Sequence, residues 1–499
     1  MFQVTVDFTH SKGTINRNIY GHFSEHIGGV FYDGLWVGEN SGIENIRGFR
    51  KALVESFKKI NPPALRWPGG CFAETYDWRD GIGPRENRPV RVNWWYSHDK
   101  RLEPNQVGTH EFMDLCALVG AEPYVAANMT SVTPLHIRNW VEYCNFPKGS
   151  TTFAKEREQN GSPEPFNVRY WGIGNENWGG GGQMTPEDCA REFIRFSTVI
   201  NSLNKGNLKF IMCGANGHDV EWTRRLMQEY ASRKWHEAAA YGMSVHYYCG
   251  NAGNPVAFTE EEWYQQLFQA DYMQRVLDDH RAAMDEFDPD RKIGLIVDEW
   301  GCWHKDGSGP SKGYNLFEQQ STMRDAVVAA MTLNMFNNRC DSVAMANVAQ
   351  LCNNLHSLYL AGGDHFVETP NYFVFDMFKT HQDAKHLNTI VSAPVMEKEG
   401  RRPMQLLSAS ASQKDGLLTI TLANLDVAKS QTVTLGSIGG DLSGEGTVTV
   451  LASPDPHDHN SFENPTKVKP TWERKRFSAQ DTVTIPAAGV AAITIRKEG

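Results

Sequence analysis

Short apolar runs alternate with amphipathic stretches from about residue 16 to residue 385. The runs have the length of strands, and the stretches between them repeat apolar residues at the spacing of a helix face. The predicted strands are Ile19–Phe23, Ala64–Trp67, Pro123–Ala127, Val168–Gly174, Leu208–Cys213, Met243–Tyr247, Ile293–Val297 and Ser342–Val348. Successive strand-then-helix units of this kind predict a (β/α)8 TIM barrel, with an inner parallel sheet and an outer ring of helices.

The pattern changes after about residue 385, where period-two alternation is broken by turns of Gly, Asp and Ser. This texture predicts a C-terminal antiparallel β-sandwich of jelly-roll-like type. Phe2–Val6 alternates in the same way, so we expect it to pair with the sandwich. The predicted domains are therefore a barrel over 16–385 and a sandwich formed by 1–15 plus 386–499.

A doubly wound open sheet is the alternative α/β fold. It would carry a Gly-rich phosphate-binding turn after an early strand, and the sequence has no such turn there. The barrel is therefore the favoured prediction.

Charge and composition limit the classes of binding partner that we expect. The net charge is −10 and the pI about 6.0, which argues against nucleic acid or an anionic membrane as partner. No segment has the uninterrupted apolar length of a membrane span, and the start of the chain does not look like a signal peptide. The 9 cysteines are scattered without a CxxC pair, as expected for a reducing cytoplasm. We therefore expect a cytoplasmic protein.

Two predicted strands end in a glutamate. The run Trp171–Glu176 ends in Gly-Asn-Glu, and Ile296–Trp300 carries Asp298 and Glu299. Parallel barrel strands deliver such residues to the mouth of the barrel. Two carboxylates from two strands are what hydrolysis of a sugar acetal requires, one as proton donor and one facing the anomeric carbon. Each could instead be an ordinary strand-end acid with a structural ion partner. Two of them together, each flanked by Trp and Gly, favour a catalytic role.

The other predicted strand ends are also polar or aromatic. Such residues gather at the active face of a barrel, and carboxylates, amides, Arg and rings together suit a hydroxyl-rich ligand. They are Glu25 and His26, Arg66 and Cys71, Asn128, Asn175, Asn216, His246 and Tyr248, and Asn347 and Gln350.

Asn175-Glu176 after the fourth strand with Glu299 after the seventh resembles the retaining glycoside hydrolases of clan A. The fuller set of motifs is similar to glycoside hydrolase family 51, chiefly α-L-arabinofuranosidases. It consists of Gly21–His26, Arg66–Cys71, Gly172–Gly179 and Asp298–Trp300. The resemblance runs over the whole chain and includes His459–Pro465 in the sandwich. The glycine run 179–182 departs from it, because many relatives carry a Cys in that turn.

The resemblance implies roles for individual residues. Glu176 would be the general acid/base and Glu299 the nucleophile. The furanose subsite would be lined by Glu25, Arg66, Cys71, Asn175 and Gln350, with His246 and Tyr248 beside the two carboxylates. Trp95 is the expected wall of the subsite, although Trp94 could take that place. A guanidinium at Arg66 would also favour the ionised form of Glu299 on physical grounds.

Other interpretations of the same residues remain. His22, His26 and His246 could hold a metal, but the His-X-His pair expected on the first strand is missing, and we predict no metal and no cofactor. Cys71 could be a nucleophile, although a small residue lining the sugar is favoured. An endo-acting β-glucanase or xylanase and a non-catalytic carbohydrate-binding barrel are the alternative functions.

The favoured hypothesis is a retaining exo-α-L-arabinofuranosidase that removes terminal arabinofuranosyl residues from arabinoxylan or arabinan oligosaccharides. The resemblance also implies a homo-oligomer, a hexamer by analogy with the family. Neither nucleic acid nor membrane is an expected partner.

Overall fold

The computed structural model describes residues 2–203, 207–233 and 239–497. Eight strands form a closed barrel in the order β10-β11-β12-β13-β2-β5-β8-β9. Their bounds are β2 Gly21–Phe23, β5 Ala64–Trp67, β8 Glu122–Ala127, β9 Tyr170–Ile173, β10 Lys209–Asn216, β11 Ala240–Gly250, β12 Gly294–Trp303 and β13 Val343–Ala349. The predicted barrel is confirmed, and each predicted strand overlaps one of these strands.

The first predicted strand is shorter than expected. Residues Arg17–Tyr20 form the 3-10 helix η1, and β2 begins only at Gly21. Asn18, Ile19 and Tyr20 are buried. Burial alone produces an apolar run whether the backbone is strand or helix, which explains the misplaced start.

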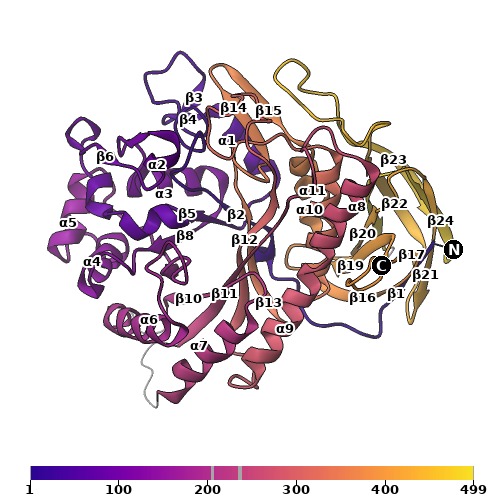
Figure 1. Ribbon diagram of the computed structural model, residues 1–499, viewed down its shortest axis with the longest axis horizontal. Coiled ribbons are helices and arrows are strands. Elements are labelled where there is room, and N and C mark those ends of the chain that lie inside the picture. Colours follow the sequence, from indigo (N-terminus) through magenta and orange to yellow (C-terminus); the bar gives the residue numbers. More distant parts are fainter. Residues whose placement is uncertain (1, 204–206, 234–238, 498–499) are drawn as a thin grey trace. The chain divides into compact units, whose positions relative to one another are not determined.

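Helices lie between the strands, and Figure 1 shows α6 and α7 beside β10. At the start of α6, Thr185 accepts a hydrogen bond from the Asp188 backbone and Pro186 occupies the first turn. The helices are α1 Lys51–Lys59, α2 Tyr96–Asp99, α3 Thr109–Val119, α4 Pro134–Asn145, α5 Thr152–Gln159, α6 Pro186–Asn201, α7 Val220–Ser232, α8 Glu260–Asp271, α9 Met273–Asp285, α10 Met323–Asn337 and α11 Pro370–Phe378.

Short elements complete the loops. The further 3-10 helices are η2 Cys71–Thr75, η3 Trp78–Gly81, η4 Arg85–Asn87 and η5 Lys379–His381. The two-stranded pairs are β3 Asn45–Ile46 with β4 Phe49–Arg50, β6 Arg91–Val92 with β7 Leu102–Glu103, β14 Tyr359–Gly362 with β15 His365–Glu368, and β17 Val395–Met396 with β18 Met404–Gln405.

The sandwich strands belong to one nine-stranded order, β23-β22-β25-β20-β19-β16-β1-β21-β24. The bounds are β1 Phe2–Asp7, β16 Lys385–Ser392, β19 Leu407–Lys414, β20 Leu417–Asn424, β21 Gln431–Ile438, β22 Gly444–Leu451, β23 Thr471–Phe477, β24 Asp481–Ile485 and β25 Val490–Arg496. The predicted sandwich is confirmed, with one difference: it is mostly antiparallel, because β1 runs parallel to β21.

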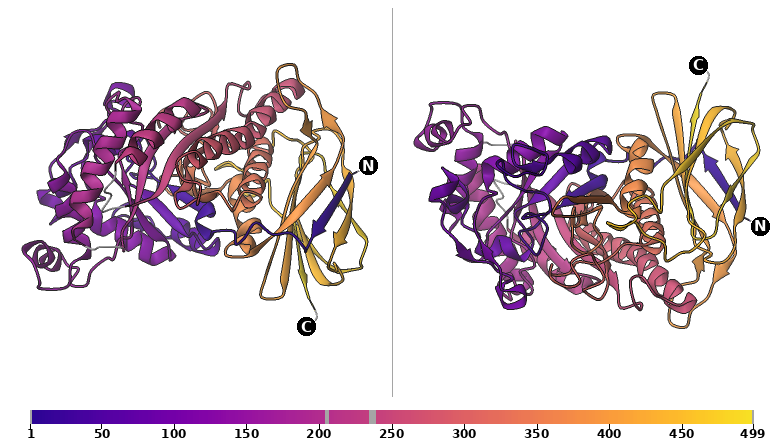
Figure 2. Two further views of the ribbon diagram at one scale, coloured as in Figure 1. Left: turned by 90° about the horizontal axis from the view of Figure 1, so that it is seen from below. Right: turned by 90° about the horizontal axis from the view of Figure 1, so that it is seen from above.

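The first strand of the chain joins the last domain, as expected. β1 pairs with β16 and β21, and Figure 2 shows it in indigo among the orange and yellow strands. Strand β16 pairs with β19 through Lys385–Leu387 and with β1 through 388–392. The core between the layers is apolar, and its buried residues include Val4, Val6, Leu387, Leu418, Ile420, Leu422, Val433, Leu435, Ile493 and Ile495.

Two strands of the sandwich lie outside the predicted β runs of the C-terminal sequence, which are Gln405–Ser410, Leu417–Leu422, Thr432–Leu435, Thr447–Leu451, Val483–Ile485 and Val490–Ile495. β16 (Lys385–Ser392) lies where we set the domain boundary, and β23 (Thr471–Phe477) reads Thr-Trp-Glu-Arg-Lys-Arg-Phe. Five of the seven residues of β23 are exposed and only Phe477 is buried, so the strand has no continuous buried face to produce apolar alternation. The edge position of this strand in the sheet order therefore hid it from sequence analysis.

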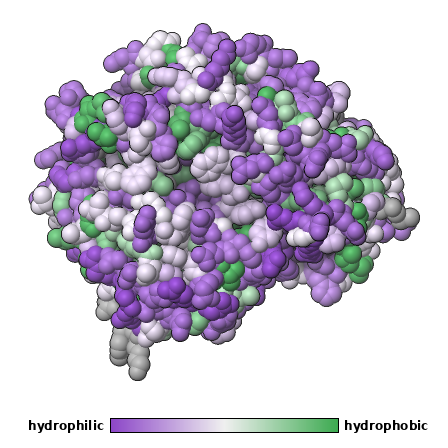
Figure 3. Space-filling view, viewed as in Figure 1, coloured by the Kyte–Doolittle hydropathy of each residue, from purple (hydrophilic) through white to green (hydrophobic). Residues whose placement is uncertain are grey.

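By contact density the chain divides into two compact units. One consists of Gly21–Tyr247 with Val276–Glu299, and the other contains the remaining described residues. The predicted domain boundaries, 16–385 against 1–15 plus 386–499, follow barrel and sandwich instead and stay a prediction. Figure 3 shows a mainly hydrophilic face with scattered apolar residues. Among the described residues, no helix is long and apolar enough to cross a membrane.

Candidate active site

The two predicted glutamates meet at one histidine. His246 Nδ1 on β11 lies 2.9 Å from Glu176 Oε1 and 3.6 Å from Glu299 Oε2. One carboxylate oxygen of each glutamate and a ring nitrogen of His246 lie within 4.8 Å of one another. Glu176 follows β9 and Glu299 lies in β12. Two residues far apart in the chain are thus close enough to act on one bond.

A sharp turn carries Glu176. The turn begins at Gly174, whose φ is +86°, and Glu176 itself has a φ of +45°. A Cβ on Gly174 would lie 2.2 Å from Asn177 Oδ1, so only glycine fits this position. The Gly-Asn-Glu-Asn sequence therefore has a local backbone reason, and the left-handed conformation at Glu176 is strain of the kind found at functional sites.

Arg66 holds Glu299 and Asn175 together. Its guanidinium, buried on β5, donates to Glu299 Oε1 at 2.8 Å and to Asn175 Oδ1 at 2.7 Å. Its Nε lies 3.9 Å from Asp298. Burial alone would lower the pKa of Arg66, but the charges of Asp298 and Glu299 outweigh it and raise that pKa. Arg66 therefore stays charged and stabilises the carboxylate of Glu299.

His246 supplies a second positive charge. Burial opposes its protonation, but the charge of Glu299 and the hydrogen bond with Glu176 raise the pKa of His246 to about 9. At neutral pH the imidazolium lies between the two glutamates. Glu299 is therefore surrounded by Arg66 and His246, which suits an ionised nucleophile.

Glu25, unlike Glu299, is surrounded in a way that favours its protonated form. Burial first, and then the charge of Glu299, raise the pKa of Glu25 to about 8, although the N–H groups of Phe72 and Trp95 oppose the shift. The Phe72 backbone donates to Glu25 Oε1 at 2.9 Å and Trp95 Nε1 donates at 3.1 Å. At pH 7 Glu25 is mainly a neutral acid, which can donate a hydrogen bond to a hydroxyl.

Gly70 makes room for these carboxylates. A Cβ at this position would lie 2.9 Å from Glu25 Oε2 and 3.2 Å from Glu299 Oε1. Because the first of these distances is shorter than real Cβ contacts, any side chain at Gly70 would push the two carboxylates apart. The Gly69-Gly70 pair is therefore part of the site.

Cys71 lies against the acid that follows β9. Its thiol donates to Glu176 Oε2 at 3.5 Å, and Asn175 Nδ2 lies 4.0 Å from the sulfur. Burial first, and then the charges of Glu176, Glu25 and Glu299, raise the pKa of the Cys71 thiol. Because the thiolate is the nucleophilic form, this environment argues against Cys71 as nucleophile and suits a small residue that lines the sugar.

Both tryptophans of the Trp94-Trp95 pair reach the site. Trp95 donates to Glu25 at 3.1 Å. A Cβ on Gly180 would lie 3.1 Å from Trp94 Cζ2 and 3.5 Å from Cys71 Sγ, so the Trp94 ring lies over the glycine run that follows Glu176. The run thus provides the space that the Trp94 ring fills.

Tyr248 lies in β11, and Gln350 follows β13 and is buried. Both belong to the second compact unit. Their assignment to the sugar site stays a prediction.

Relatives of known sequence and structure match over the full chain. Residues 56–253 match a family model described as the alpha-L-arabinofuranosidase 1 domain, and residues 298–488 match the alpha-L-arabinofuranosidase C-terminal domain. An intracellular exo-alpha-L-arabinofuranosidase of Bacteroides ovatus is 38% identical over 99% of this chain and 95% of its own. The crystal structure of the GH51 arabinofuranosidase from Xanthomonas axonopodis pv. citri is 35% identical, with a TM-score of 0.92 over 99% of this chain and 100% of that one.

The chain belongs to glycoside hydrolase family 51. The alpha-L-arabinofuranosidase of Thermotoga maritima, solved as an arabinose complex, is also similar, at 30% identity and a TM-score of 0.88 over 100% of both chains. The resemblance inferred from the motifs is thereby confirmed.

Glu74 is a buried acid that supports the family 51 site and that the sequence pattern did not indicate. Glu74 on η2 accepts from the Asn175 backbone at 2.5 Å, from Asn177 Nδ2 at 3.2 Å, and from the Met129 and Thr130 backbones at 2.9 Å each. It joins the ends of two barrel strands and fixes the turn that carries Glu176. Its one sequence signal is an acid in an otherwise apolar stretch after Cys71.

Tyr124 is a second missed residue. Its hydroxyl donates to Asp298 Oδ2 at 2.8 Å, and its ring lies 5.9 Å from the Arg66 guanidinium carbon. Tyr124 sits in the middle of β8, so no strand-end rule points to it. It positions Asp298, which in turn lies beside Arg66.

The three histidines considered as metal ligands lie in different surroundings. His26 is bonded to Trp67 Nε1 at 3.0 Å and lies 3.1 Å from Glu103, and neither His22 nor His26 belongs to a group of close ligand atoms in the described residues. The group that does contain His246 also contains Glu176 and Glu299. There the Arg66 guanidinium already occupies Glu299, so a cation would meet a positive charge. These three side chains therefore fit a pair of acids with a histidine between them better than they fit a metal site.

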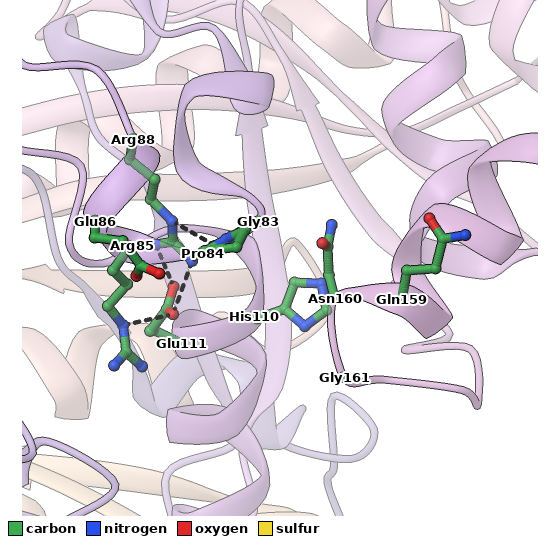
Figure 4. A pocket seen from close by; sticks show the side chains of 10 residues that line it. All are labelled: Gly83, Pro84, Arg85, Glu86, Arg88, His110, Glu111, Gln159, Asn160 and Gly161. Carbon is green, nitrogen blue, oxygen red and sulfur yellow. Dashed lines mark hydrogen bonds and ion pairs between the residues drawn. The ribbon is translucent and has the colours of Figure 1, made fainter.

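A surface pocket of about 420 Å³ lies on the loop that leads to the tryptophans (Figure 4). Its charges pair with one another. Arg88 binds Glu111 at 2.9 and 3.0 Å and also the carbonyl oxygens of Gly83, Asn105 and Gln106. Arg85 Nε binds Glu111 at 3.1 Å. These bonds hold together the two ends of the loop that carries Trp94 and Trp95, so the charged residues of this pocket have a structural role.

Proposed function

We propose that this protein is a retaining exo-α-L-arabinofuranosidase that removes terminal α-L-arabinofuranosyl residues from arabinoxylan or arabinan oligosaccharides. The proposal rests on the pair Glu176 and Glu299, whose carboxylate oxygens lie within 4.8 Å of each other around His246. Close carboxyl groups, about 5–5.5 Å apart, are typical of retaining glycosidases, whereas inverting enzymes need room for a water between them.

In the first step Glu299 attacks the anomeric carbon and Glu176 gives its proton to the leaving oxygen. The glycosidic C–O bond breaks and an ester forms between the sugar and Glu299. The positive charges of Arg66 and His246 support the ionised form of Glu299 before attack. The acid form of Glu176 is the one that protonates the leaving group.

In the second step water cleaves the ester. Glu176, now ionised, takes a proton from the water, and the oxygen of that water attacks the anomeric carbon, so that Glu299 leaves as a carboxylate. His246 Nδ1, 2.9 Å from Glu176 Oε1, holds that carboxyl group in place for this step. Two displacements at one carbon retain its configuration.

The setting of the enzyme is part of the proposal. A cytoplasmic location is supported by the relative named intracellular, and the substrates would then be imported oligosaccharides. A homo-oligomer, a hexamer by analogy with the family, is also part of the proposal and rests on that analogy alone. The endo-acting and non-catalytic alternatives are less favoured, because both carboxylates are intact and the similar relatives are named as arabinofuranosidases.

The test is the anomer that forms first. With p-nitrophenyl α-L-arabinofuranoside followed by proton NMR, we expect release of nitrophenol and an α-arabinofuranose signal before mutarotation. A β signal would contradict retention, and absence of nitrophenol would favour the non-catalytic barrel. Arabinoxylo-oligosaccharides of defined structure separate exo from endo action, since an exo enzyme releases arabinose and leaves the xylose chain intact.

The raised pKa of Glu25 predicts a pH effect. The protonated acid binds a sugar hydroxyl, and above about pH 8 the ionised form adds a negative charge beside Glu299. We therefore expect kcat/KM to fall as the pH rises through about 8. In Glu25→Gln the side chain cannot ionise, so the alkaline limb should move to higher pH, with a lower rate throughout.

The measurement is a pH profile of kcat/KM for wild type and Glu25→Gln. Glu86→Gln, an exposed acid on the nearby loop, is the control and should match the wild type. An alkaline limb that is identical in wild type and Glu25→Gln would show that another group sets it.

A further inference from the structure

A second group of metal-ligating side chains lies just beyond Glu299 along the chain. One side-chain atom each of Cys302, His304 and Asp325 lies within 4.8 Å of the others. All three residues are buried, and all belong to the compact unit that contains the sandwich. Their spacing in the sequence matches no metal-binding motif, so only the fold brings them together. The prediction of no metal considered other histidines and did not include this group.

The backbone that presents Cys302 and His304 is held by one side chain. Cys302 lies in β12, and His304 follows that strand two positions later, as expected for side chains on one side of a strand. Gln319 Nε2 donates to the Cys302 carbonyl at 3.0 Å, and Gln319 Oε1 accepts from the His304 N–H at 2.8 Å. The two side chains therefore have a fixed origin.

The carboxylate of Asp325 uses its two oxygens differently. Oδ2 accepts from the Thr322 N–H at 2.8 Å and from the Thr322 hydroxyl at 3.2 Å, in the capping box that begins α10. Oδ1 faces the group, where His304 Nε2 lies at 2.9 Å and His356 Nδ1 at 3.8 Å. The cap thus orients the carboxylate so that Oδ1 can bind a ligand.

His356 stands beside the group with both ring nitrogens unsatisfied. Neither nitrogen has a hydrogen-bond partner among the described residues, and the same holds for His304 Nδ1. Buried polar atoms normally have partners, and an unpaired one is explained by a group such as an ion or a water. Gly301 makes room for this ring, because a Cβ there would lie 2.5 Å from His356 Cβ.

The donor set suits zinc. One thiolate, one carboxylate and two imidazoles provide four ligands of the kinds that zinc binds in tetrahedral sites. The negative charges of Cys302 and Asp325 would balance the double positive charge of the ion, as burial of an ion requires. Gln266 Nε2 donates to Cys302 Sγ at 3.3 Å, and such outer contacts support a ligating group.

The cation next to the group has partners of its own. Arg324 donates to the Ala252 carbonyl at 2.7 Å and to the Asn254 carbonyl at 3.2 Å. Its guanidinium carbon lies 3.9 Å from the centroid of the Phe258 ring. The guanidinium thus bonds to carbonyl oxygens, whereas Arg66 donates directly to Glu299.

We propose that this group is a structural zinc site with four ligands, namely Cys302, His304, Asp325 and His356. Small side-chain rotations bring the donor atoms to zinc bonding distances of about 2.0–2.3 Å. The thiol of Cys302 releases its proton to water as the metal binds, and each imidazole binds through an unprotonated nitrogen. Because the ligands are buried, the ion is enclosed as the chain folds. It joins the end of β12 to the start of α10 and to the segment after β13.

The test begins with the metal content of full-length wild type, produced without an affinity tag in zinc-supplemented cells. By plasma mass spectrometry we expect about one zinc ion per chain, as a single four-ligand site implies. Competition with a chelator measures affinity, which should fall at least about tenfold in Cys302→Ser and in His356→Gln, since even outer-shell partners contribute about 10–100-fold. Chelation should lower the unfolding temperature of wild type, and added zinc should restore it.

Cobalt gives a readout that a purely structural role of the cysteine would not change. Protein from cells grown with Co²⁺ in place of zinc should show the sulfur-to-cobalt charge-transfer band of a bound thiolate, and Cys302→Ser should lack it. Cys144→Ser is the matched control, because Cys144 is a buried free cysteine in α4, outside the group. It should keep both the zinc and the band.

Three results would overturn the proposal. One is wild type without zinc, and another is a Cys302→Ser variant that keeps the zinc affinity and the cobalt spectrum of wild type. The third is zinc that is kept by Cys302→Ser and lost from Glu299→Gln, which would place the metal at the two glutamates instead.

Discussion

Glu299→Ala should lower kcat by about four orders of magnitude or more, on activated and unactivated arabinofuranosides alike, since loss of a nucleophile has effects of this size in other hydrolases. The methyl group cannot form the glycosyl ester, so both displacements fail whatever the leaving group. The measurement is the steady-state rate with dinitrophenyl and xylo-oligosaccharide leaving groups.

The loss of Glu299 also removes a partner from Arg66, which donates to it at 2.8 Å. Glu299→Gln keeps an oxygen for that guanidinium and serves as the second variant, so that a folding defect can be told from a chemical one. Thermal unfolding should be closer to wild type for Gln than for Ala, with both variants inactive. Glu286→Ala, an exposed acid paired with Arg224, is the control for loss of a carboxylate. Residual activity close to that of the wild type would remove Glu299 from the nucleophile role.

Glu176→Ala should show a strong dependence on the leaving group. General acid catalysis contributes roughly 10²–10⁴-fold, and a leaving group that departs as a stable anion does not need it. We therefore expect a loss of about 10³-fold with xylose as leaving group and a much smaller loss in the first step with dinitrophenolate. Accumulation of the glycosyl-enzyme should then limit turnover, because the base is also missing.

Azide tests the second half of that role. As a small nucleophile it needs no base, so it should restore turnover of the activated substrate by Glu176→Ala and yield α-arabinofuranosyl azide. The product is identified by NMR. Glu187→Ala, a partly exposed acid on α6 bonded to Arg225, should show neither effect. An equal loss on all leaving groups, with no azide product, would exclude Glu176 as acid/base.

Much of the fold could be predicted because its signals are local. The barrel strands are buried on both faces, so each appears as a continuous apolar run. Thr185 and Pro186 mark the start of α6, and Thr259 and Glu262, which form a capping box, mark the acidic start of α8. These features depend on residues within one turn of each other.

Other elements, or one of their ends, could not be predicted because burial or exposure removed the periodic signal. All residues of α10 (Met323–Asn337) are buried, so no polar face marks where it begins, and the helical pattern of the sequence, Phe317–Asn337, starts too early. Phe317 has a φ of +56° and precedes the helix. At the other extreme, β23 is exposed along most of its length.

For the site, the linear order of residues was enough to show which side chains stand at strand ends, since a parallel barrel brings every such end to the same face. It pointed to Glu176, Glu299, Arg66 and His246 before any distance was known. The protonation states of the site residues, and the residues that position them, depend instead on the tertiary structure. Glu25 is neutral and His246 is charged because each is buried next to other charged groups. Those neighbours come from distant positions in the chain. Glu74 and Tyr124 escaped notice for the same physical reason: a buried residue that positions another is defined by its contact in space, which linear spacing does not encode.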